Sequence, residues 1–466
     1  MPKTNKTFVC NNCGNESLRW LGKCPECGGW STFQEFTVVS DSKPGGSRKE
    51  EAKPQKLGKI SDSPLKRIST NISEFDRVLG GSAEQNSMGI VPGSVILISG
   101  DPGIGKSTLM LQLAINLAER TSQIARRNKE KTTNNKRKSI SVLYVSGEES
   151  EAQIAHRAQR IMSKKLLSES TIDIVSSTDI DASLEAAFRI KADLIIIDSV
   201  QTIGSAEINS FPGSLPQIRY VAMRVSNFAK KHNVPIFMVG HVTKEGIVAG
   251  PQLLSHMVDV VLYLEGETPP AGGTGTRLIR SFKNRYGDTQ EVGIFVMDEK
   301  GLMEITAVEN LFIDTTKPSI GSAITVVQEG SRPILVEIQA LAIKSNLSFP
   351  RRVATGISEK RLEMLLAVLQ KHGRLNTYDY DIFVNVVGGL KIKETASDLA
   401  VILSIASSIK NKPLRKAAAI GEVGLLGEVK SVLQLEKRIK EANKFGFKIV
   451  FSKNNVDNIY SMIKSV

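Results

Sequence analysis

A glycine-rich segment of eight residues, 100–107, constrains the fold of this chain more than any other feature. It reads Gly-Asp-Pro-Gly-Ile-Gly-Lys-Ser and matches the pattern G-x-x-x-x-G-K-[ST] at every fixed position. An apolar run, 94–100 (SVILISG), precedes it, and a helical pattern, 107–120, follows it. Glycines allow backbone N–H groups to close around phosphates, and the N-terminus of the next helix adds a favourable dipole. The segment therefore predicts a nucleotide-binding strand–loop–helix unit.

Side chains of this loop can be assigned to ATP and Mg²⁺. We expect Lys106 to reach the β- and γ-phosphates, Ser107 to hold Mg²⁺, and Thr108 to assist at the α-phosphate. The residues predicted to contact the nucleotide are Gly100, Asp101, Pro102, Gly103, Ile104, Gly105, Lys106, Ser107 and Thr108.

Two further apolar runs end in carboxylates that ATP hydrolysis would need. Residues 194–198 (LIIID) end in Asp198, which we expect to orient Mg²⁺ through its water shell; the alternative is a buried strand followed by a capping Asp. Hydrolysis also requires a carboxylate that positions the attacking water. Glu148, with Glu149 as second choice, directly follows the run 141–147, where RecA-like ATPases carry their catalytic glutamate. The alternative for both is a helix-capping role.

Strand and helix patterns alternate through the middle of the chain. Apolar runs occur at 94–100, 141–147, 192–200, 234–242, 258–266 and 291–301, with helical stretches between them. This order predicts an α/β fold with a mostly parallel sheet covered by helices. After residue 310, predicted paired strands at 324–343, helices at 358–373 and 393–409, and a strand at 381–389 indicate a separate α/β domain.

The four cysteines of the chain all lie near its beginning, as Cys10-x₂-Cys13 and Cys24-x₂-Cys27. Two such pairs can place four thiolates tetrahedrally around one zinc ion. A disulfide is the alternative, and the absence of a secretory signal disfavours it because cytosolic thiols stay reduced. A site closed by four cysteines has no open coordination position. We therefore expect structural rather than catalytic zinc.

These patterns divide the chain into four segments. We expect a four-cysteine zinc finger at 1–36, a linker at 37–66, a RecA-like ATPase at 67–305 and a second α/β domain at 310–466. The linker is rich in Lys, Pro, Gly and Ser and lacks apolar periodicity.

Charge and hydropathy narrow the expected partners. The formal net charge is +13, which suits a nucleic-acid partner because Lys and Arg displace counterions from phosphates; a merely basic protein is the alternative. No apolar run reaches the roughly 18 residues of a membrane span, so we expect a cytoplasmic protein without membrane contact. The basic stretch 126–138 is expected to be a solvated surface loop, with nucleic-acid contact as the minority alternative.

Together these motifs resemble the bacterial RadA (Sms) family. The matching pieces, in order, are LRWLGKCPECGGW, GDPGIGKST, YVSGEES, LIIIDSVQT and Lys283-Asn-Arg-Tyr-Gly287, with Tyr286 where the family usually has Phe. The resemblance implies a DNA-stimulated ATPase of DNA repair and homologous recombination. Such a protein promotes branch migration and heteroduplex extension in RecA-mediated strand exchange. It also implies single-stranded and branched DNA, RecA and a replicative helicase as partners, and a homo-hexamer.

The resemblance assigns roles to further residues. Lys283 and Arg285 would support ATP turnover by reaching a neighbouring subunit's γ-phosphate; the alternative is a solvated turn. Residues near the DNA channel would be His241 or Thr243 as sensors and Lys244, Arg219 and Arg224 as contacts, against ordinary surface roles.

The domain after residue 310 resembles the proteolytic domain of Lon. Ala396 occupies the position of the nucleophilic serine, with Ser397 beside it, and Lys430 falls near the catalytic lysine. Without the serine we expect an inactive, protease-like domain that serves assembly and DNA binding. A basic DNA-binding face would comprise Arg332, Lys344, Arg351, Arg352, Lys391 and Lys393. An ATP-dependent peptidase and a nucleotide-gated regulator remain alternative functions.

Overall fold

The structure of the protein, a computed structural model, describes residues 5–10, 16–26, 28–38, 66–82, 87–128, 140–162, 170–240, 254–266, 275–305, 319–414 and 417–464. The chain forms two compact units. The first comprises Met1–Glu265, Ile279–Thr289 and Glu299–Leu302, and the second Gly266–Leu278, Gln290–Asp298 and Met303–Val466. The second unit thus takes in three segments, 266–278, 290–298 and 303–305, that the sequence pattern assigned to the ATPase.

The N-terminal segment forms a small three-stranded antiparallel sheet. Strands β1 (Asn5–Cys10), β2 (Glu16–Ser17) and β3 (Phe33–Val38) are ordered β2-β1-β3. Its described core consists of Cys10, Cys24 and Phe33, with Phe8 packed against them. A core this small is typical of a module that needs another source of stability, such as a metal ion.

The central sheet has nine strands in the order β14-β13-β12-β11-β6-β10-β9-β7-β8. From β11 to β8, each neighbouring pair runs parallel, which confirms the predicted mostly parallel sheet. Every residue of β6, β7, β9 and β10 is buried, because helices cover a parallel sheet on both faces. The strand bounds are β6 Val95–Gly100, β7 Val142–Ser146, β8 Ile172–Ser176, β9 Leu194–Asp198, β10 Ile236–Val239, β11 Val260–Gly266, β12 Thr276–Asn284, β13 Val292–Asp298 and β14 Gly301–Glu304.

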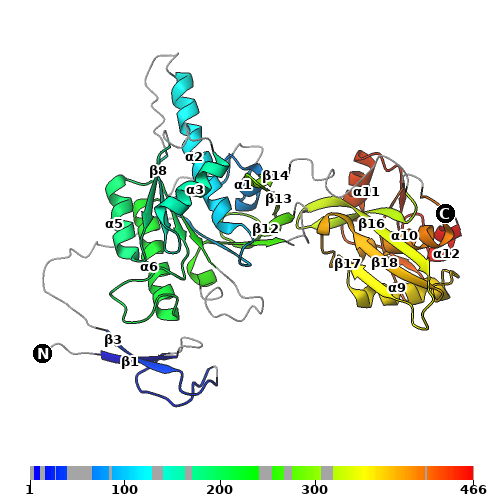
Figure 1. Ribbon diagram of the computed structural model, residues 1–466, viewed down its shortest axis with the longest axis horizontal. Helices are drawn as coiled ribbons and strands as arrows, with labels where there is room; N and C mark the ends of the chain where they lie inside the picture. Colours follow the sequence, from blue (N-terminus) through cyan, green and yellow to red (C-terminus); the bar gives the residue numbers. More distant parts are fainter. Residues whose placement is uncertain are drawn as a thin grey trace, which may run out of the picture. The chain divides into compact units, whose positions relative to one another are not determined.

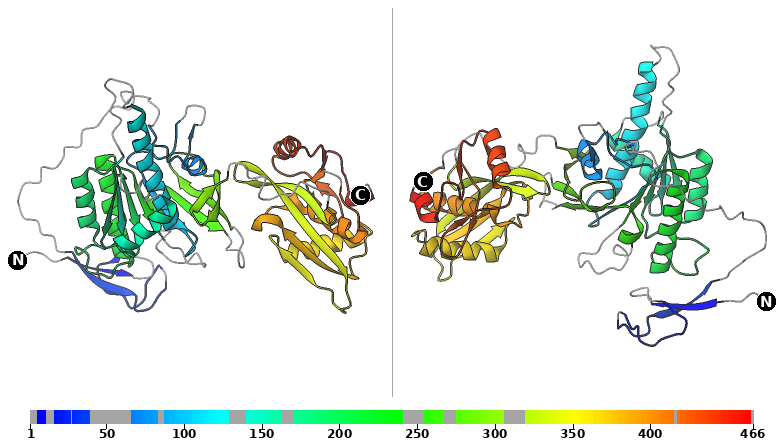
Figure 2. Two further views of the ribbon diagram at one scale, coloured as in Figure 1. Left: turned by 45° about the horizontal axis from the view of Figure 1, so that its top comes forward. Right: turned by 180° about the vertical axis from the view of Figure 1, so that it is seen from behind.

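Helices cover this sheet on both faces. On one face α5 (Ile180–Ile190) and α6 (Leu215–His232) lie side by side and bury alternate residues of β6 and β9 (Figure 1). Helix α2 (Lys106–Asn128), which begins in the glycine-rich loop, lies across the sheet from them (Figure 2). Two shorter helices are α1 (Ser73–Leu79) and α3 (Glu151–Ile161), and β4 (Gly81–Ser82) pairs with β5 (Ser87–Met88).

The second unit contains a six-stranded sheet in the order β17-β18-β16-β15-β19-β22. Its long antiparallel hairpin, β15–β16, confirms the paired strands expected at 324–343. The strands are β15 Ser322–Glu329, β16 Arg332–Lys344, β17 Arg352–Thr355, β18 Tyr380–Val386, β19 Ala417–Ala419 and β22 Ile449–Phe451, with a separate pair of β20 Glu422–Val423 and β21 Val429–Lys430. The helices are α9 Glu359–Lys371, α10 Asp398–Lys410, α11 Leu435–Lys444 and α12 Ile459–Lys464, with 3₁₀ turns η2 (Val387–Gly389) and η3 (Thr395–Ser397).

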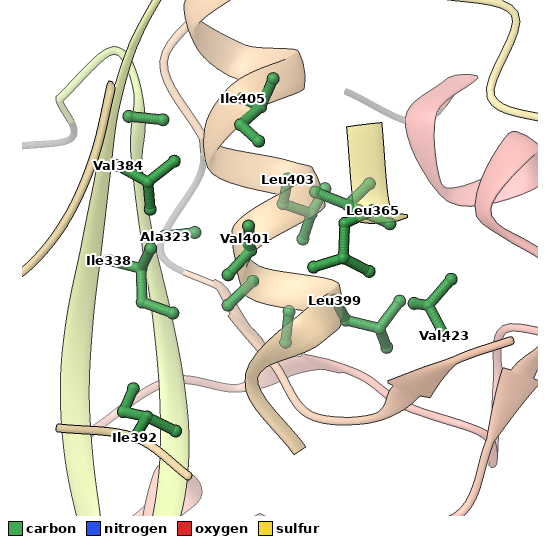
Figure 3. Close-up of a cluster of buried hydrophobic side chains, with 14 of the residues drawn as sticks. Ala323, Ile338, Leu365, Val384, Ile392, Leu399, Val401, Leu403, Ile405 and Val423 are labelled. Carbon is green, nitrogen blue, oxygen red and sulfur yellow. The ribbon is translucent and has the colours of Figure 1, made fainter. Parts of the chain in front are cut away.

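Helix α10 forms the centre of this unit. All its residues from Asp398 to Ser407 are buried. Val401 points toward Ile338 and Ala323 of the sheet, while Leu403 lies beside Leu365 of α9 (Figure 3). On the opposite face of the sheet, α11 packs over β15 and β16 in a second apolar cluster.

The structure corrects several expectations from sequence. Strands β8 and β12 were not predicted, although β12 ends in Lys283 and Asn284. The helix expected over 393–409 begins at Asp398, after η3. Helix α2 continues to Asn128, so residues 126–128 of the basic stretch are helical rather than loop; the rest of that stretch lies outside the described residues. None of the helices in the described part of the chain is long and apolar enough to cross a membrane.

Candidate nucleotide-binding site

The glycine-rich loop connects β6 to α2 through backbone conformations that favour glycine. Gly100, Gly103 and Gly105 have φ angles of 152°, 74° and 111°. A Cβ on Gly100 would lie 2.3 Å from the carbonyl oxygen of Leu264, on the neighbouring strand β11. Ser107 and Thr108 are half-buried in the first turn of α2. The structure thus gives the loop the strand–loop–helix setting that phosphate binding requires.

Lys106 is buried, and its ammonium group lies inside the loop. Its Nζ donates to the carbonyl oxygens of Gly100 and Asp101, both at 2.8 Å. Burial lowers the pKa of Lys106 below its ordinary value of 10.5, and the carboxylates of Asp198, Asp101 and Glu148 act against that shift. These carboxylates therefore lie around the ammonium group.

Asp198 ends β9 at the same edge of the sheet and is 5% exposed. Its Oδ2 accepts a hydrogen bond of 2.6 Å from the hydroxyl of Tyr144, on β7. Its Oδ1 accepts no hydrogen bond from the residues that the structure describes. This position suits a carboxylate that orients a hydrated metal ion.

Glu148 and Glu149 follow β7 but have different partners. The Oε1 of Glu148 accepts a 2.5 Å hydrogen bond from the hydroxyl of Ser199, the residue after Asp198. Glu149 instead forms an ion pair with Arg157 of α3. The contact with Ser199 holds the Glu148 carboxylate beside Asp198, at the edge of the sheet where the phosphate loop lies. Ser150, not either glutamate, caps α3, through a capping box with Gln153.

Lys283 and Arg285 do not lie near this loop. The Nζ of Lys283 donates to the carbonyl oxygens of Ser255 and Val258, both at 2.7 Å. Arg285, whose side chain is 53% exposed, is paired with Asp259 at 3.1 Å. Burial, and then Arg285, lower the pKa of Lys283.

The strand register fixes how far these two cations are from the phosphates. Asp259 bonds through its backbone and carboxylate to Val95, the first residue of β6, whereas the loop begins at Gly100, the last. Five steps of about 3.3 Å separate the two ends by roughly 17 Å. Arg285 therefore cannot contact phosphates bound to its own subunit's loop.

The segment 283–287, which begins at the end of β12, is attached by hydrogen bonds to the start of the ATPase domain. The amide of Asn284 donates to the carbonyl oxygens of Val78 and Leu79 in α1. Arg67 donates to the carbonyl oxygens of Leu79, Gly89 and Tyr286. Hydrogen bonds thus anchor the 283–287 segment, although Arg285 and Gly287 are exposed.

The structure describes only some of the other residues that were predicted to contact DNA. Arg224 is ion-paired with Asp181 of α5 at 2.6 Å, and Arg219 is half-buried on the same helix, α6. His241, Thr243 and Lys244 lie outside the described residues.

Two of the four predicted zinc ligands are described. Cys10 and Cys24 are 0% and 1% exposed and form no disulfide. Around Cys24 the backbone turns tightly: the N–H of Gly28 donates to the Cys24 carbonyl and the Cys24 N–H donates to that of Gly29, both at 2.9 Å. This turn and the two buried thiols fit a zinc knuckle. Cys13 and Cys27 lie outside the described residues.

In the second unit, the positions predicted from the Lon resemblance to match the catalytic serine and lysine have different surroundings. Ala396 and Ser397 are buried in η3, whereas Lys430 is 55% exposed and ion-paired with Glu428 at 3.5 Å. A Ser–Lys dyad requires a desolvated amine beside an exposed nucleophile, and neither condition holds here.

One of the residues predicted to form a basic DNA-binding face on this unit does not present its charge to solvent. Arg352 turns its guanidinium group inward, onto the carbonyl oxygens of Arg351, Thr377 and Tyr380. Arg351, Lys344, Lys391 and Lys393 are exposed, and Arg332 is half-buried.

Comparisons with known proteins identify the family. Residues 63–246 match the AAA domain family, and residues 8–35, which contain all four cysteines, match the rubredoxin metal binding domain family. The DNA repair protein RadA of Pseudomonas aeruginosa is 43% identical over 453 residues, 96% of this chain and 92% of that protein. RadA of Bacillus subtilis is 42% identical over 455 residues, 96% of this chain and 92% of its own. The chain belongs to the RadA family.

As a member of the RadA family of DNA repair proteins, this protein combines an ATP-binding AAA domain with a zinc-binding ribbon. RadA of Escherichia coli is likewise 42% identical over 95% of this chain. Among solved structures, a KaiC-like protein of Pyrococcus horikoshii matches 52% of this chain and 100% of its own, at 18% identity and a TM-score of 0.37. That similarity is too weak to add to the assignment.

Three residues that hold other groups in place were not predicted: two contact the carboxylates of the nucleotide site, and the third, Arg67, anchors the 283–287 segment. Tyr144 stands in an apolar strand, Ser199 follows Asp198, and Arg67 follows the linker. Tyr144 carried a usable signal, because a hydroxyl inside a buried strand needs a partner. For the other two, nothing in the local sequence distinguishes them from ordinary surface residues.

Proposed function

We propose that the protein is a DNA-dependent ATPase that processes recombination intermediates in DNA repair. It promotes branch migration and heteroduplex extension during RecA-mediated strand exchange. The observation that carries the proposal is the meeting of Lys106, Asp198 and Glu148 at one edge of the sheet, in a chain that belongs to the RadA family.

Each of these residues has one task in the proposed reaction. Lys106 exchanges the carbonyl oxygens of Gly100 and Asp101 for the β- and γ-phosphates. Glu148 orients the attacking water and accepts its proton, while Glu149 remains bound to Arg157. Ser107 and Asp198 would hold Mg²⁺, which neutralises charge on the phosphates.

Lys283 and Arg285 act between subunits in the proposed mechanism. Because roughly 17 Å of strand separates them from their own loop, they serve a neighbouring subunit's γ-phosphate in a homo-hexameric ring. Hydrolysis is thereby coupled to assembly.

The proposal assigns zinc to the N-terminal ribbon and DNA to the basic surface of the protein. Cys10, Cys13, Cys24 and Cys27 would hold a structural zinc ion that stabilises the N-terminal ribbon. Single-stranded and branched DNA binds through basic surface, consistent with a net charge of +13. RecA and a replicative helicase are the protein partners we propose. The peptidase alternative receives no support, given the exposed, ion-paired Lys430.

ATP hydrolysis with and without single-stranded DNA tests the proposal. We expect stimulation by DNA in the full-length protein and loss of all turnover in Lys106→Ala. Lys230→Ala, at an exposed position of α6, is the matched control and should behave like the unmodified protein. Turnover that ignores DNA would favour the regulator alternative and refute a DNA motor. Extension of a heteroduplex in a RecA-driven exchange reaction then tests the specific role.

A further inference from the structure

Two buried hydroxyl groups contact the two carboxylates of the nucleotide site. The hydroxyl of Tyr144 lies 2.6 Å from Oδ2 of Asp198, and that of Ser199 lies 2.5 Å from Oε1 of Glu148. Tyr144 is 1% exposed and Ser199 is 0% exposed, so neither hydroxyl has bulk water as a partner. Neither residue belongs to the nucleotide-binding loop.

The position of Tyr144 explains why its hydroxyl meets Asp198. Strands β7 and β9 are parallel, with Tyr144 opposite Ile196 and Ser146 opposite Asp198. A tyrosine side chain leaning along its strand therefore extends to the carboxylate two residues ahead on the neighbouring strand. All five residues of β7 are buried, and a phenylalanine would fill the same apolar space. The hydroxyl would be costly there without its acceptor.

The hydroxyl of Tyr144 donates its hydrogen bond to one oxygen of the Asp198 carboxylate. Because a neutral hydroxyl contributes no charge, it fixes the orientation of the carboxylate while leaving its negative charge for a metal ion.

Hydrogen bonds also hold the backbone at Ser199. It directly follows β9, and its carbonyl oxygen accepts hydrogen bonds from the N–H and the hydroxyl of Thr202. Glu148, in contrast, is exposed, and a solvated glutamate side chain ordinarily samples many rotamers. The hydroxyl of Ser199 contacts one oxygen of the Glu148 carboxylate and so limits the freedom of the side chain.

We propose that Tyr144 and Ser199 are positioning residues of this site, Tyr144 for the Asp198 carboxylate and Ser199 for the Glu148 carboxylate. The inference rests on the proposed ATPase function. It separates two properties: Tyr144 sets how strongly Mg²⁺ strengthens nucleotide binding, and Ser199 sets the rate of hydrolysis once nucleotide and Mg²⁺ are bound.

Nucleotide binding without turnover tests the role of Tyr144. A fluorescent, non-hydrolysable ATP analogue is titrated into full-length Tyr144→Phe with Mg²⁺ and with EDTA. We expect unchanged affinity in EDTA, which also shows that the variant is folded, and a gain in affinity from Mg²⁺ reduced about tenfold. Tyr220→Phe is the matched control, since it removes a hydroxyl bound to Glu207, outside the site. An unreduced gain from Mg²⁺ would overturn the assignment of Tyr144.

Steady-state kinetics test the role of Ser199. For Ser199→Ala we expect kcat to fall about tenfold while KM for ATP and the gain from Mg²⁺ stay unchanged. Added to Glu148→Gln, the same substitution should have no further effect, because the glutamine still accepts the Ser199 hydrogen bond but can no longer take the proton of the attacking water. Ser404→Ala, which removes another fully buried hydroxyl, is the control. Equal losses from Ser199→Ala in the unmodified protein and in the Glu148→Gln variant would indicate a purely structural role and refute the proposal.

The two proposals can fail separately. If the unmodified protein does not hydrolyse ATP, or if Lys106→Ala does, the proposed function is wrong. If hydrolysis is normal and depends on Lys106, but Tyr144→Phe and Ser199→Ala show neither expected effect, only the positioning inference is wrong.

Discussion

At the scale of single residues, hydrogen-bond partners separate side chains that the sequence leaves equivalent. Glu148 and Glu149 are neighbours at the end of the same strand, yet one contacts Ser199 and the other Arg157. A glutamate that is already bound to an arginine is poorly placed to orient water. Their different partners, rather than their position in the sequence, predict their different importance.

Substitution of each glutamate tests this difference. Glu148→Gln should lower kcat at least about 100-fold, because a glutamine cannot accept the proton of the attacking water. ATP binding should remain. Glu149→Gln should change kcat by less than about threefold, since it removes only a partly exposed ion pair. If Glu149→Gln were the more damaged variant, the two roles would have to be exchanged.

The lowered pKa of Lys106 predicts the alkaline limit of ATP capture. As pH rises, a lysine with a lowered pKa loses its proton below the ordinary value of 10.5, and with it the charge that binds phosphate. We therefore expect kcat/KM, which reports the free enzyme, to fall before pH 10.5. The alkaline fall in kcat should occur at a higher pH than that in kcat/KM, because bound phosphates favour the ammonium form of Lys106. If kcat and kcat/KM fell at the same alkaline pH, this prediction would be contradicted.

At the scale of elements, the sequence predicted some features of this chain and not others. Strands β6, β7, β9 and β10 are continuous apolar runs, so their existence and parallel order follow from local pattern. Strand β12 alternates less clearly, because it carries Arg277, Arg280 and Lys283. The location of the 283–287 segment at the far end of the sheet depends on pairing between distant strands, which no local pattern encodes.

Among the contacts between elements, those of Arg67 should contribute most clearly to the free energy of unfolding. Its guanidinium group joins the 283–287 segment to α1 and to Gly89 through three carbonyl oxygens. Arg67→Ala leaves these acceptors without that donor, and we expect the free energy of unfolding to fall by about 2 kcal/mol. Urea denaturation measures this, with Arg189→Ala, an exposed arginine of α5, as control. A loss no larger than that of the control would show that water replaces the guanidinium group.

At the scale of the whole molecule, the nucleotide loop and the Lys283–Arg285 pair occupy opposite ends of β6. In the proposed mechanism, a second copy of the chain brings both to one nucleotide. ATP hydrolysis should then depend on the interface between two copies, not on a single copy.

Mixing two inactive variants tests this dependence. Lys106→Ala and Lys283→Ala should each lack turnover, yet rings assembled from both should regain activity. In a random ring about a quarter of the interfaces pair an intact loop with an intact Lys283. Lys106→Ala combined with Asp198→Asn, two defects in one site, is the control and should regain none. If neither mixture regains ATP hydrolysis, Lys283 acts within its own subunit or only supports the fold.

Helix α10 has a consequence for how the chain is made. Its buried circumference contacts β16, which precedes it, and α12, which follows it much later. The elements made before the helix, β15, β16 and α9, supply most of its contacts, and α12 covers a further part of it only after more of the chain has been made. Until then part of an apolar helix is open to other chains, so a growing chain that ends before α12 is more prone to aggregate than the completed unit. Chaperone demand should therefore fall once α12 has packed onto α10.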